Sequence, residues 1–138
     1  MMDKTQLTLL NVGDNLDQLM NLDPRGYGVC RILYAASREY TGKPLTINAA
    51  EKLASTLHSG DLAYILTGFV LRPHGSAETD GMVSSVLLAR ALVLACDAKP
   101  VIVCAPECLQ AARAMAQAAG LHWYGSVEEL RAYPASLA

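Results

Sequence analysis

Residues 61–69 read Asp-Leu-Ala-Tyr-Ile-Leu-Thr-Gly-Phe, a mostly apolar run that is followed by a loop containing glycine. The run is short and has a glycine on either side, which is typical of a strand covered on both faces of a sheet. A polar loop separates it from Glu-Thr-Asp-Gly at 78–81, where a long apolar segment begins. A strand that returns through a helix places backbone N–H groups and carboxylates at one edge of the sheet. We expect the functional site at this edge.

Periodicity and stop signals predict the other elements. Three helices are expected before the first strand, with Asp14 as the N-cap of the first and Asn48 with Glu51 as a capping box for the third. Later segments alternate between helix and strand, so the predicted fold is α/β: a helical N-terminal portion, then a small parallel sheet in a three-layer, Rossmann-like β-α-β-α-β arrangement. We expect one domain over 1–138. The predicted helices cover 14–22, 29–40, 48–60, 80–96, 107–119 and a short stretch from Ser126, and the predicted strands cover 61–67, 99–104 and 121–124.

The composition narrows the class of protein. Hydrophobic residues make up 52% of the 138 and charged residues 17%, which excludes a disordered chain and favours association into a homo-oligomer or with a companion chain. A net charge of −2 gives no basic face for nucleic acid or an anionic membrane. The apolar segment 82–96 contains Arg90 and is shorter than the roughly 18–20 residues of a membrane span, and no secretory signal is recognisable. We therefore expect a cytoplasmic protein that binds a small molecule.

The four cysteines are expected to be reduced and buried. Cys104 and Cys108 lie close in sequence and leave a metal or redox pair as an alternative, although their spacing differs from the usual two-residue gap. We predict no metal site and no organic cofactor. Glycine-rich dinucleotide and phosphate loops, H-E-x-x-H and G-x-S-x-G are absent from the sequence.

The loop between Thr67 and Asp80 is longer than most connections from a strand to a helix, which favours a functional loop over a disordered excursion. Thr79 or Asp80 is expected to cap the following helix. Glu78 adds a second carboxylate beside the helix N-terminus, and Gly81 leaves room for an anionic ligand to approach the backbone. Two acids in different environments can take different protonation roles.

Three other charged or titratable residues give weaker indications of a functional role. Arg72 and His74 lie in the same loop and are more often solvated than catalytic. Arg25 lies beside Gly26 in an earlier turn, where it either caps a helix C-terminus or pairs with a substrate carboxylate.

The Thr-Gly-Phe and Glu-Thr-Asp-Gly motifs, the Leu-Ala-Arg-Ala-Leu segment at 88–92 and the Asp-Pro-Arg-Gly turn at 23–26 resemble the D-glutamate cyclase-like family. The resemblance covers roughly residues 16–121. It implies a lyase of amino-acid metabolism that converts D-glutamate to 5-oxo-D-proline with loss of water. Under this resemblance Glu78 and Asp80 are the catalytic residues, and the substrate is bound by Thr67, Gly68, Thr79, Gly81, Arg25 and Gly26.

A second hypothesis stays open beside the enzyme. The glycine-rich G-D-G-G-N-E segment that family members carry in a second half has no counterpart after Leu121, which would make this chain only part of the family's full domain. The alternative function is a non-catalytic subunit with the same fold that binds a small acid or supports assembly.

Overall fold

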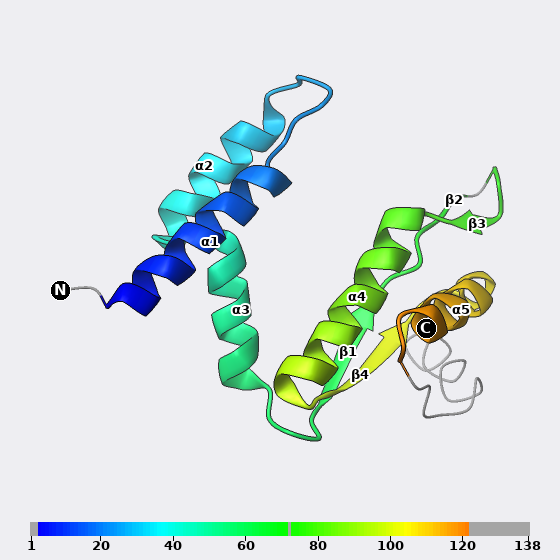
Figure 1. Ribbon diagram of the computed structural model, residues 1–138. Coiled ribbons are helices and arrows are strands. Elements are labelled where there is room, and N and C mark those ends of the chain that lie inside the picture. Colours follow the sequence, from blue (N-terminus) through cyan, green and yellow to red (C-terminus); the bar gives the residue numbers. More distant parts are fainter. Residues whose placement is uncertain (1–2, 72, 122–138) are drawn as a thin grey trace. The chain divides into compact units, whose positions relative to one another are not determined.

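The computed structural model describes residues 3–71 and 73–121, which belong to two compact units (Figure 1). Unit 1 is Met1–Thr56 and unit 2 is Leu57–Ala138. Unit 1 contains three helices: α1 (Lys4–Met20), α2 (Val29–Thr41) and α3 (Leu45–Thr56). The prediction of three helices before the first strand is confirmed.

Helix α1 begins ten residues before the predicted start. The carboxylate of Asp3 accepts a hydrogen bond from the N–H of Thr5, and the side chain of Gln6 accepts one from the N–H of Asp3. This capping box stabilises a helical start that the apolar spacing alone did not reveal. The prediction of Asp14 as N-cap is wrong, because Asp14 lies within the helix and pairs with Arg38 of α2 at 3.1 Å.

Helix α3 also begins earlier than predicted. Its first N–H groups, on Leu45 and Thr46, donate to the carboxylate of Asp17 at 2.6 and 3.0 Å. A side chain of α1 therefore caps α3, and the predicted capping box at Asn48 is wrong. Glu51 forms an ion pair with Lys43 instead.

Unit 2 is built on a pair of parallel strands. β1 (Leu62–Leu66) pairs with β4 (Lys99–Val103), and Ile65 lies opposite Ile102. The long helix α4 (Thr79–Cys96) connects them, and β4 is followed by the 3₁₀ turn η1 (Pro106–Cys108) and by α5 (Leu109–Ala118). The parallel pair and the alternation of strand and helix agree with the prediction.

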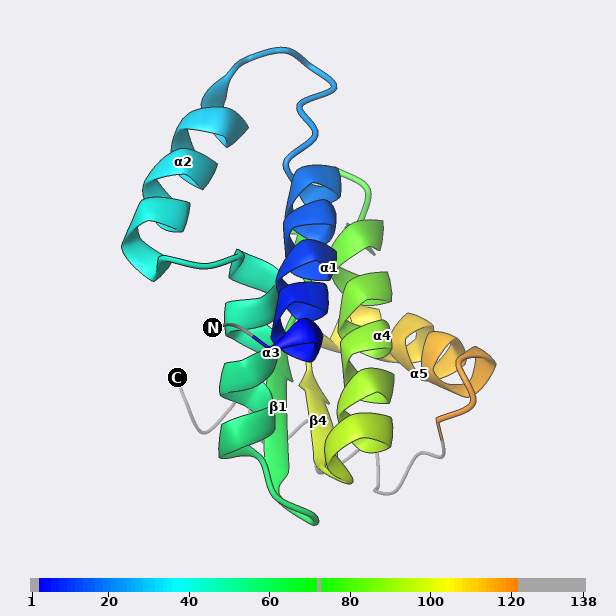
Figure 2. The ribbon, with the colours of Figure 1, turned by 60° about the vertical axis from the view of Figure 1, so that its left-hand side comes forward.

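The core of unit 2 lies on one face of this strand pair (Figure 2). Val86 and Ala89 of α4, Ile102 of β4 and Ala116 of α5 form one buried cluster, against which Ile65 of β1 packs. Because Ile65 and Ile102 share a face, α4 and α5 both cover that face. The alternate residues of β1, Leu62, Tyr64 and Leu66, are exposed, so the described residues of unit 2 cover one face of this strand, and coverage of its second face stays a prediction.

The mixed α/β class is therefore confirmed, with five α-helices and a parallel pair of strands among the described residues. The three-layer arrangement stays a prediction, since the described residues of unit 2 form two layers. The strand predicted over 121–124 falls outside the described residues except for Leu121, and the helix predicted from Ser126 lies wholly outside them.

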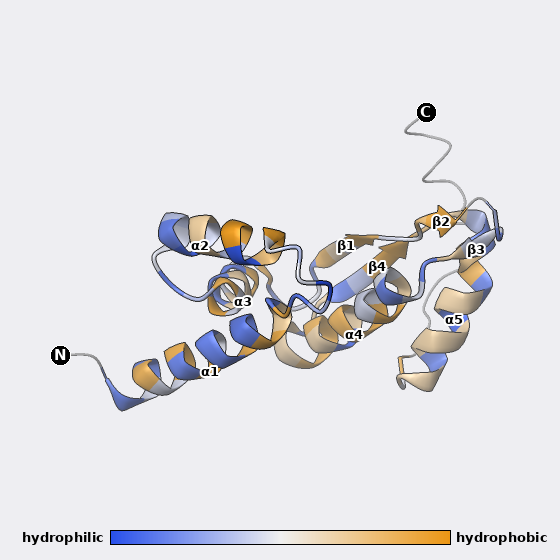
Figure 3. Cartoon of the chain, turned by 90° about the horizontal axis from the view of Figure 1, so that it is seen from above, coloured by the Kyte–Doolittle hydropathy of each residue, from blue (hydrophilic) through white to orange (hydrophobic). Residues whose placement is uncertain are grey.

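Helix α4 is apolar around most of its circumference (Figure 3). Its inner face, with Met82, Val86 and Ala89, is buried against the strands and α5. Its outer residues Val83 and Leu87 are exposed. By length and composition alone α4 could cross a membrane, a test that core helices of soluble proteins also pass. In this structure 28% of the segment is buried, by the strands and α5 on its inner face.

Candidate functional site

The carboxyl ends of β1 and β4 meet the N-terminus of α4. The N–H of Thr67 donates to the carbonyl of Val103 at 2.9 Å, which extends the pairing beyond the end of β1. The Thr67 hydroxyl oxygen lies 3.2 Å from the point where a Cβ on Gly81 would stand. The residues of the two motifs 67–69 and 78–81 are thus brought together at one edge of the sheet, as parallel topology predicts.

Gly68 is required by close packing at this edge. It has a φ of +94°, and a Cβ added there would lie 2.8 Å from the Cβ of Cys104 and 3.1 Å from the backbone nitrogen of Ala105. A side chain is excluded both by the backbone conformation and by the space. The β1 end can approach β4 this closely because the residue is glycine.

The loop between the two motifs is folded as a small hairpin that the sequence did not reveal. β2 (Val70–Leu71) pairs antiparallel with β3 (Ser76–Ala77), and the carbonyl of Leu71 accepts from the N–H groups of His74 and Gly75, both at 2.9 Å. The N–H of Glu78 then donates to the carbonyl of Phe69 at 2.9 Å. The hairpin returns the chain to its starting point, so Glu78 lies beside Phe69. His74 is exposed at the hairpin turn, and Arg72 lies outside the described residues.

Glu78 is the N-cap of α4, so the prediction that Thr79 or Asp80 occupies this position is wrong. The Glu78 carboxylate makes no capping hydrogen bond, while that of Asp80 accepts from the N–H of Gly81 at 2.7 Å. Glu78, Thr79 and Asp80 are all exposed. Two carboxylates therefore flank a helix N-terminus, one of them without a cap bond and one bound to a backbone donor.

Cys104 and Cys108 lie beneath this edge as part of the core. Both are buried, and the Cys108 thiol donates to the carbonyl of Gly68 at 3.7 Å. Burial raises the pKa of both thiols, and the neighbouring Cys108 raises the pKa of Cys104 further. Protonated, buried thiols are poor metal ligands and poor nucleophiles. Among the described residues, no group of three His, Cys, Asp or Glu side chains is placed to hold a metal ion.

The cysteine predictions hold only in part. All four thiols are free, but Cys30 is exposed and Cys96 is half-buried, so burial is confirmed only for Cys104 and Cys108.

Arg25 and Gly26 belong to unit 1, whereas the other six predicted site residues belong to unit 2. The Asp23 carboxylate organises the turn around them by accepting from the N–H groups of Gly26 and Gly28 at 3.1 and 2.6 Å. Both glycines have positive φ values, 69° and 75°. Arg25 itself is exposed. This turn leads into α2, whose N-cap is Gly28.

Sequence reasoning missed the most buried acid of unit 1. The side chain of Asp17 is 2% exposed, and its carboxylate accepts from the hydroxyls of Tyr34 and Thr46 and from two N–H groups of α3. Burial opposes its charge, but the hydrogen bonds from Thr46, Leu45 and Tyr34 outweigh burial and lower its pKa. Burial and the Asp17 charge raise the pKa of Tyr34. Every oxygen of Asp17 is used within the unit, so its role is structural.

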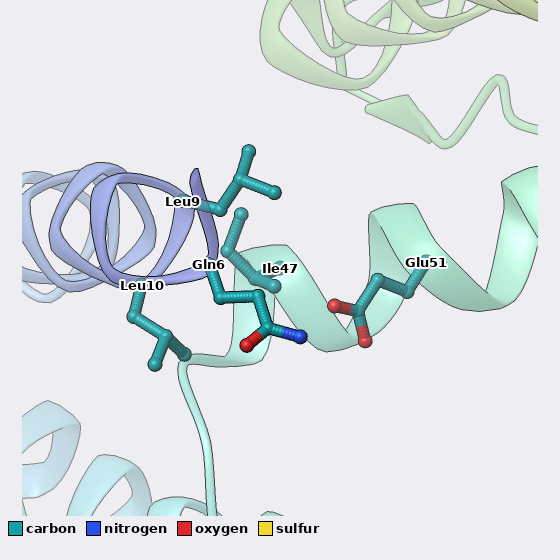
Figure 4. A pocket seen from close by; sticks show the side chains of 5 residues that line it. All are labelled: Gln6, Leu9, Leu10, Ile47 and Glu51. Atoms are coloured by element: carbon teal, nitrogen blue, oxygen red, sulfur yellow. The ribbon is translucent and has the colours of Figure 1, made fainter. Parts of the chain in front are cut away.

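A hollow of about 250 Å³ lies between α1 and α3 (Figure 4). Its polar side chains already have partners, since Gln6 belongs to the α1 capping box and Glu51 pairs with Lys43. Neither side chain is free for a ligand without breaking these contacts. The lining residues are Gln6, Leu9, Leu10, Ile47 and Glu51.

The described residues define an α/β protein whose candidate site lies where parallel strands end and a helix begins. The model of the D-glutamate cyclase-like, C-terminal family matches residues 16–135. The chain belongs to this family. Neither the curated proteins nor the solved structures gave a match.

Proposed function

We propose that this chain binds D-glutamate at the edge formed by residues 67–68 and 78–81 and cyclises it to 5-oxo-D-proline with loss of water. The proposal is supported by family membership and by one structural observation. The β2–β3 hairpin closes the loop so that Thr67 lies against Gly81 and Glu78 lies beside Phe69. A small acid bound there would meet two carboxylates and a helix N-terminus at once.

The reaction joins two groups of one molecule. The substrate amine attacks its own γ-carboxyl carbon, a C–N bond forms, and a carboxyl oxygen leaves as water. Holding the substrate in a folded shape provides much of the acceleration. Glu78, whose carboxylate makes no capping bond, takes one proton from the substrate ammonium, and Asp80 takes the second from the nitrogen as the C–N bond forms. The two acids then deliver these two protons to the γ-carboxylate oxygen, which leaves as water.

Substrate binding changes the bonds at the helix N-terminus. The N–H of Gly81, proposed to hold the substrate α-carboxylate, donates to Asp80 in this structure. The incoming carboxylate replaces the Asp80 carboxylate at that donor and frees Asp80 for proton transfer. Thr67 and Gly68 line the base of the site and Thr79 adds a hydroxyl.

Turnover of D-glutamate by the purified chain tests this proposal, with 5-oxo-D-proline followed by chiral chromatography and L-glutamate as the mirror-image control. Glu78→Gln and Asp80→Asn should each lower the rate by about 10²–10⁴-fold, because each removes a proton-transfer group. Glu39→Gln is the matched control, since Glu39 is an exposed carboxylate on α2. Equal rates for Glu78→Gln and Glu39→Gln would remove Glu78 from the mechanism.

The second candidate function is binding of a small acid without turnover. It is favoured by the exposure of both Glu78 and Asp80, since a site open to solvent does not exclude water from the reacting groups of a bound substrate. Calorimetric titration with D-glutamate separates the two functions. Saturable binding that Asp80→Asn alters, without product, would support the binding protein over the enzyme.

A further inference from the structure

Helix α2 turns its polar side toward its own unit. The hydroxyl of Tyr34 donates to Asp17 at 3.2 Å, the guanidinium of Arg38 donates to Asp14 at 3.1 Å, and the hydroxyl of Thr41 donates to the carbonyl of Lys43 at 2.7 Å. These three residues are half-buried and recur at helical spacing. The bonds of Tyr34 and Arg38 therefore hold this side of α2 against α1, and Thr41 binds the loop that leads to α3.

The apolar residues of α2 lie on the other side. They repeat every three or four positions, as the sequence pattern indicated, but the other helices of unit 1 do not cover them. We call this set the outer stripe: Val29, Ile32, Leu33, Ala36 and Tyr40. Val29, Ile32, Leu33 and Tyr40 are 54, 72, 62 and 92% exposed, and Ala36 is also exposed. A helix that directs its apolar stripe outward normally has a partner on that side.

We propose that the outer stripe binds the outer stripe of a second copy of this chain, with the two α2 helices antiparallel about a twofold axis. The axis would pass between Leu33 and Ala36. Leu33 then packs against the partner's Ala36, and Val29 against the partner's Tyr40, so each layer combines a larger and a smaller side chain. A parallel pair would instead place alanine on alanine and tyrosine on tyrosine. Antiparallel packing also opposes the two helix dipoles favourably.

The area available suits a dimer. Tyr27 lies just before α2 and is exposed, so each copy offers two tyrosines, each burying on the order of 150–250 Å² when covered, beside three branched aliphatic side chains. Two copies together would bury roughly 1,200–1,600 Å², the size of a standard specific interface. The outer stripe contains no charged residue, so pairing desolvates no ion.

The first test is the mass of the full chain in solution, measured by light scattering across a concentration series. The wild-type protein should be a dimer, and Ala36→Asp should raise its dissociation constant at least 100-fold by placing a charge in the stripe. Ala35→Asp is the matched control, because Ala35 is the exposed neighbouring residue on the same helix but lies outside the stripe. A folded monomeric wild-type protein, or equal effects of the two variants, would overturn the proposal.

The second test reads orientation. Two proteins are prepared, Val29→Cys/Cys30→Ser and Tyr40→Cys/Cys30→Ser, and each is oxidised alone and mixed with the other. Antiparallel pairing predicts cross-linked dimers only in the mixture, because position 29 of one copy faces position 40 of the other. Cross-linking of each protein alone would show a parallel pair. If the wild-type protein is a monomer and Ala36→Asp lowers its melting temperature, the outer stripe is covered by another part of the same chain, and the dimer proposal is overturned.

Discussion

Asp17 has the role of an N-cap residue although it lies on a different helix from the one it caps. Its carboxylate accepts the first N–H groups of α3 and the hydroxyls of Thr46 and Tyr34, and so connects all three helices of unit 1. A buried carboxylate with four donors is favourable only while all of them stay in place. Removing the charge leaves backbone donors without an acceptor of equal strength.

Asp17→Asn should therefore lower the free energy of unfolding by about 1–3 kcal/mol, the usual worth of hydrogen bonds to a charged group. Urea denaturation followed by far-ultraviolet circular dichroism measures the change. Asp14→Asn is the control, because Asp14 is on the same helix and forms a half-exposed ion pair with Arg38. Asp14→Asn should lower the free energy of unfolding by less than about 1 kcal/mol. Equal decreases for the two variants would contradict the role given to Asp17.

For single residues, the sequence predicted contacts correctly where the contact partners follow from the order and direction of the strands. Parallel strands end at the same edge, so Thr67 and Gly81 could be expected to lie close together without knowing any coordinates. Asp17 could not be found in this way. Its partners Leu45 and Thr46 are 28 and 29 residues away, and an acid within a helix ordinarily indicates a solvated surface.

Among the elements, α1 and α3 cross at a glycine. Gly13 is buried, and a Cβ added there would lie 2.3 Å from Cγ1 of Ile47 and 2.8 Å from Cβ of Pro44. The two helices can approach closely because Gly13 has no side chain. The crossing places Asp17, one turn further along α1, beside the start of α3.

Gly13→Ala should destabilise the protein, against the usual gain of about 1 kcal/mol for glycine to alanine within a helix. The added methyl group must displace Ile47 or Pro44, and we expect a net loss of about 1–3 kcal/mol in urea denaturation. Gly26→Ala is a contrasting case, since the site has open space and only a positive φ to oppose the substitution. A stabilised Gly13→Ala protein would show that the helices are not in close contact there.

Element types were predictable and several boundaries were not. Apolar spacing identified α2, which ends one residue beyond the prediction at a Gly42 that adopts the left-handed conformation. The starts of α1 and α3 depend on side chains at Asp3 and Asp17, which apolar periodicity does not report. The β2–β3 hairpin has strands of two residues each, too short to produce a repeating pattern.

Across the whole molecule, the two units are stabilised differently. Unit 1 depends on a buried charge network, while unit 2 has an apolar core around Val86 and Ile102. The hydrogen bonds that lower the pKa of Asp17 below its ordinary 3.8 mean that the unfolded chain takes up a proton more readily than the folded one. Stability from this group is present above pH 4 and is lost as the pH falls through the folded pKa.

Acid should therefore loosen unit 1 before unit 2. In ¹H–¹⁵N spectra recorded from pH 7 down to pH 2, the amide signals of α1–α3 should lose dispersion at a higher pH than those of β1 and β4. Asp17→Asn should flatten this acid dependence, because the variant has no proton to bind at that position. Simultaneous loss of both sets of signals in the wild-type protein would contradict separate stabilisation of the units.

The family and the α/β class could be predicted from the sequence of the whole chain, because the sequence motifs and the alternation of strand and helix can be recognised without coordinates. The direction in which α2 turns its apolar side could not be predicted from the sequence. Periodicity identifies an apolar stripe but does not say whether that stripe faces its own unit, and the polar partners Asp14 and Asp17 decide this.

The packing of α4 has a consequence for biosynthesis. Its buried face is completed by Ile102 and Ala116, which are translated after the helix itself. While the chain grows, α4 therefore emerges from the ribosome with only part of its apolar surface covered, and such transiently exposed surface makes a partly folded chain prone to aggregation. The order of synthesis makes the emergence of β4 and α5 the step that commits this segment to the folded protein.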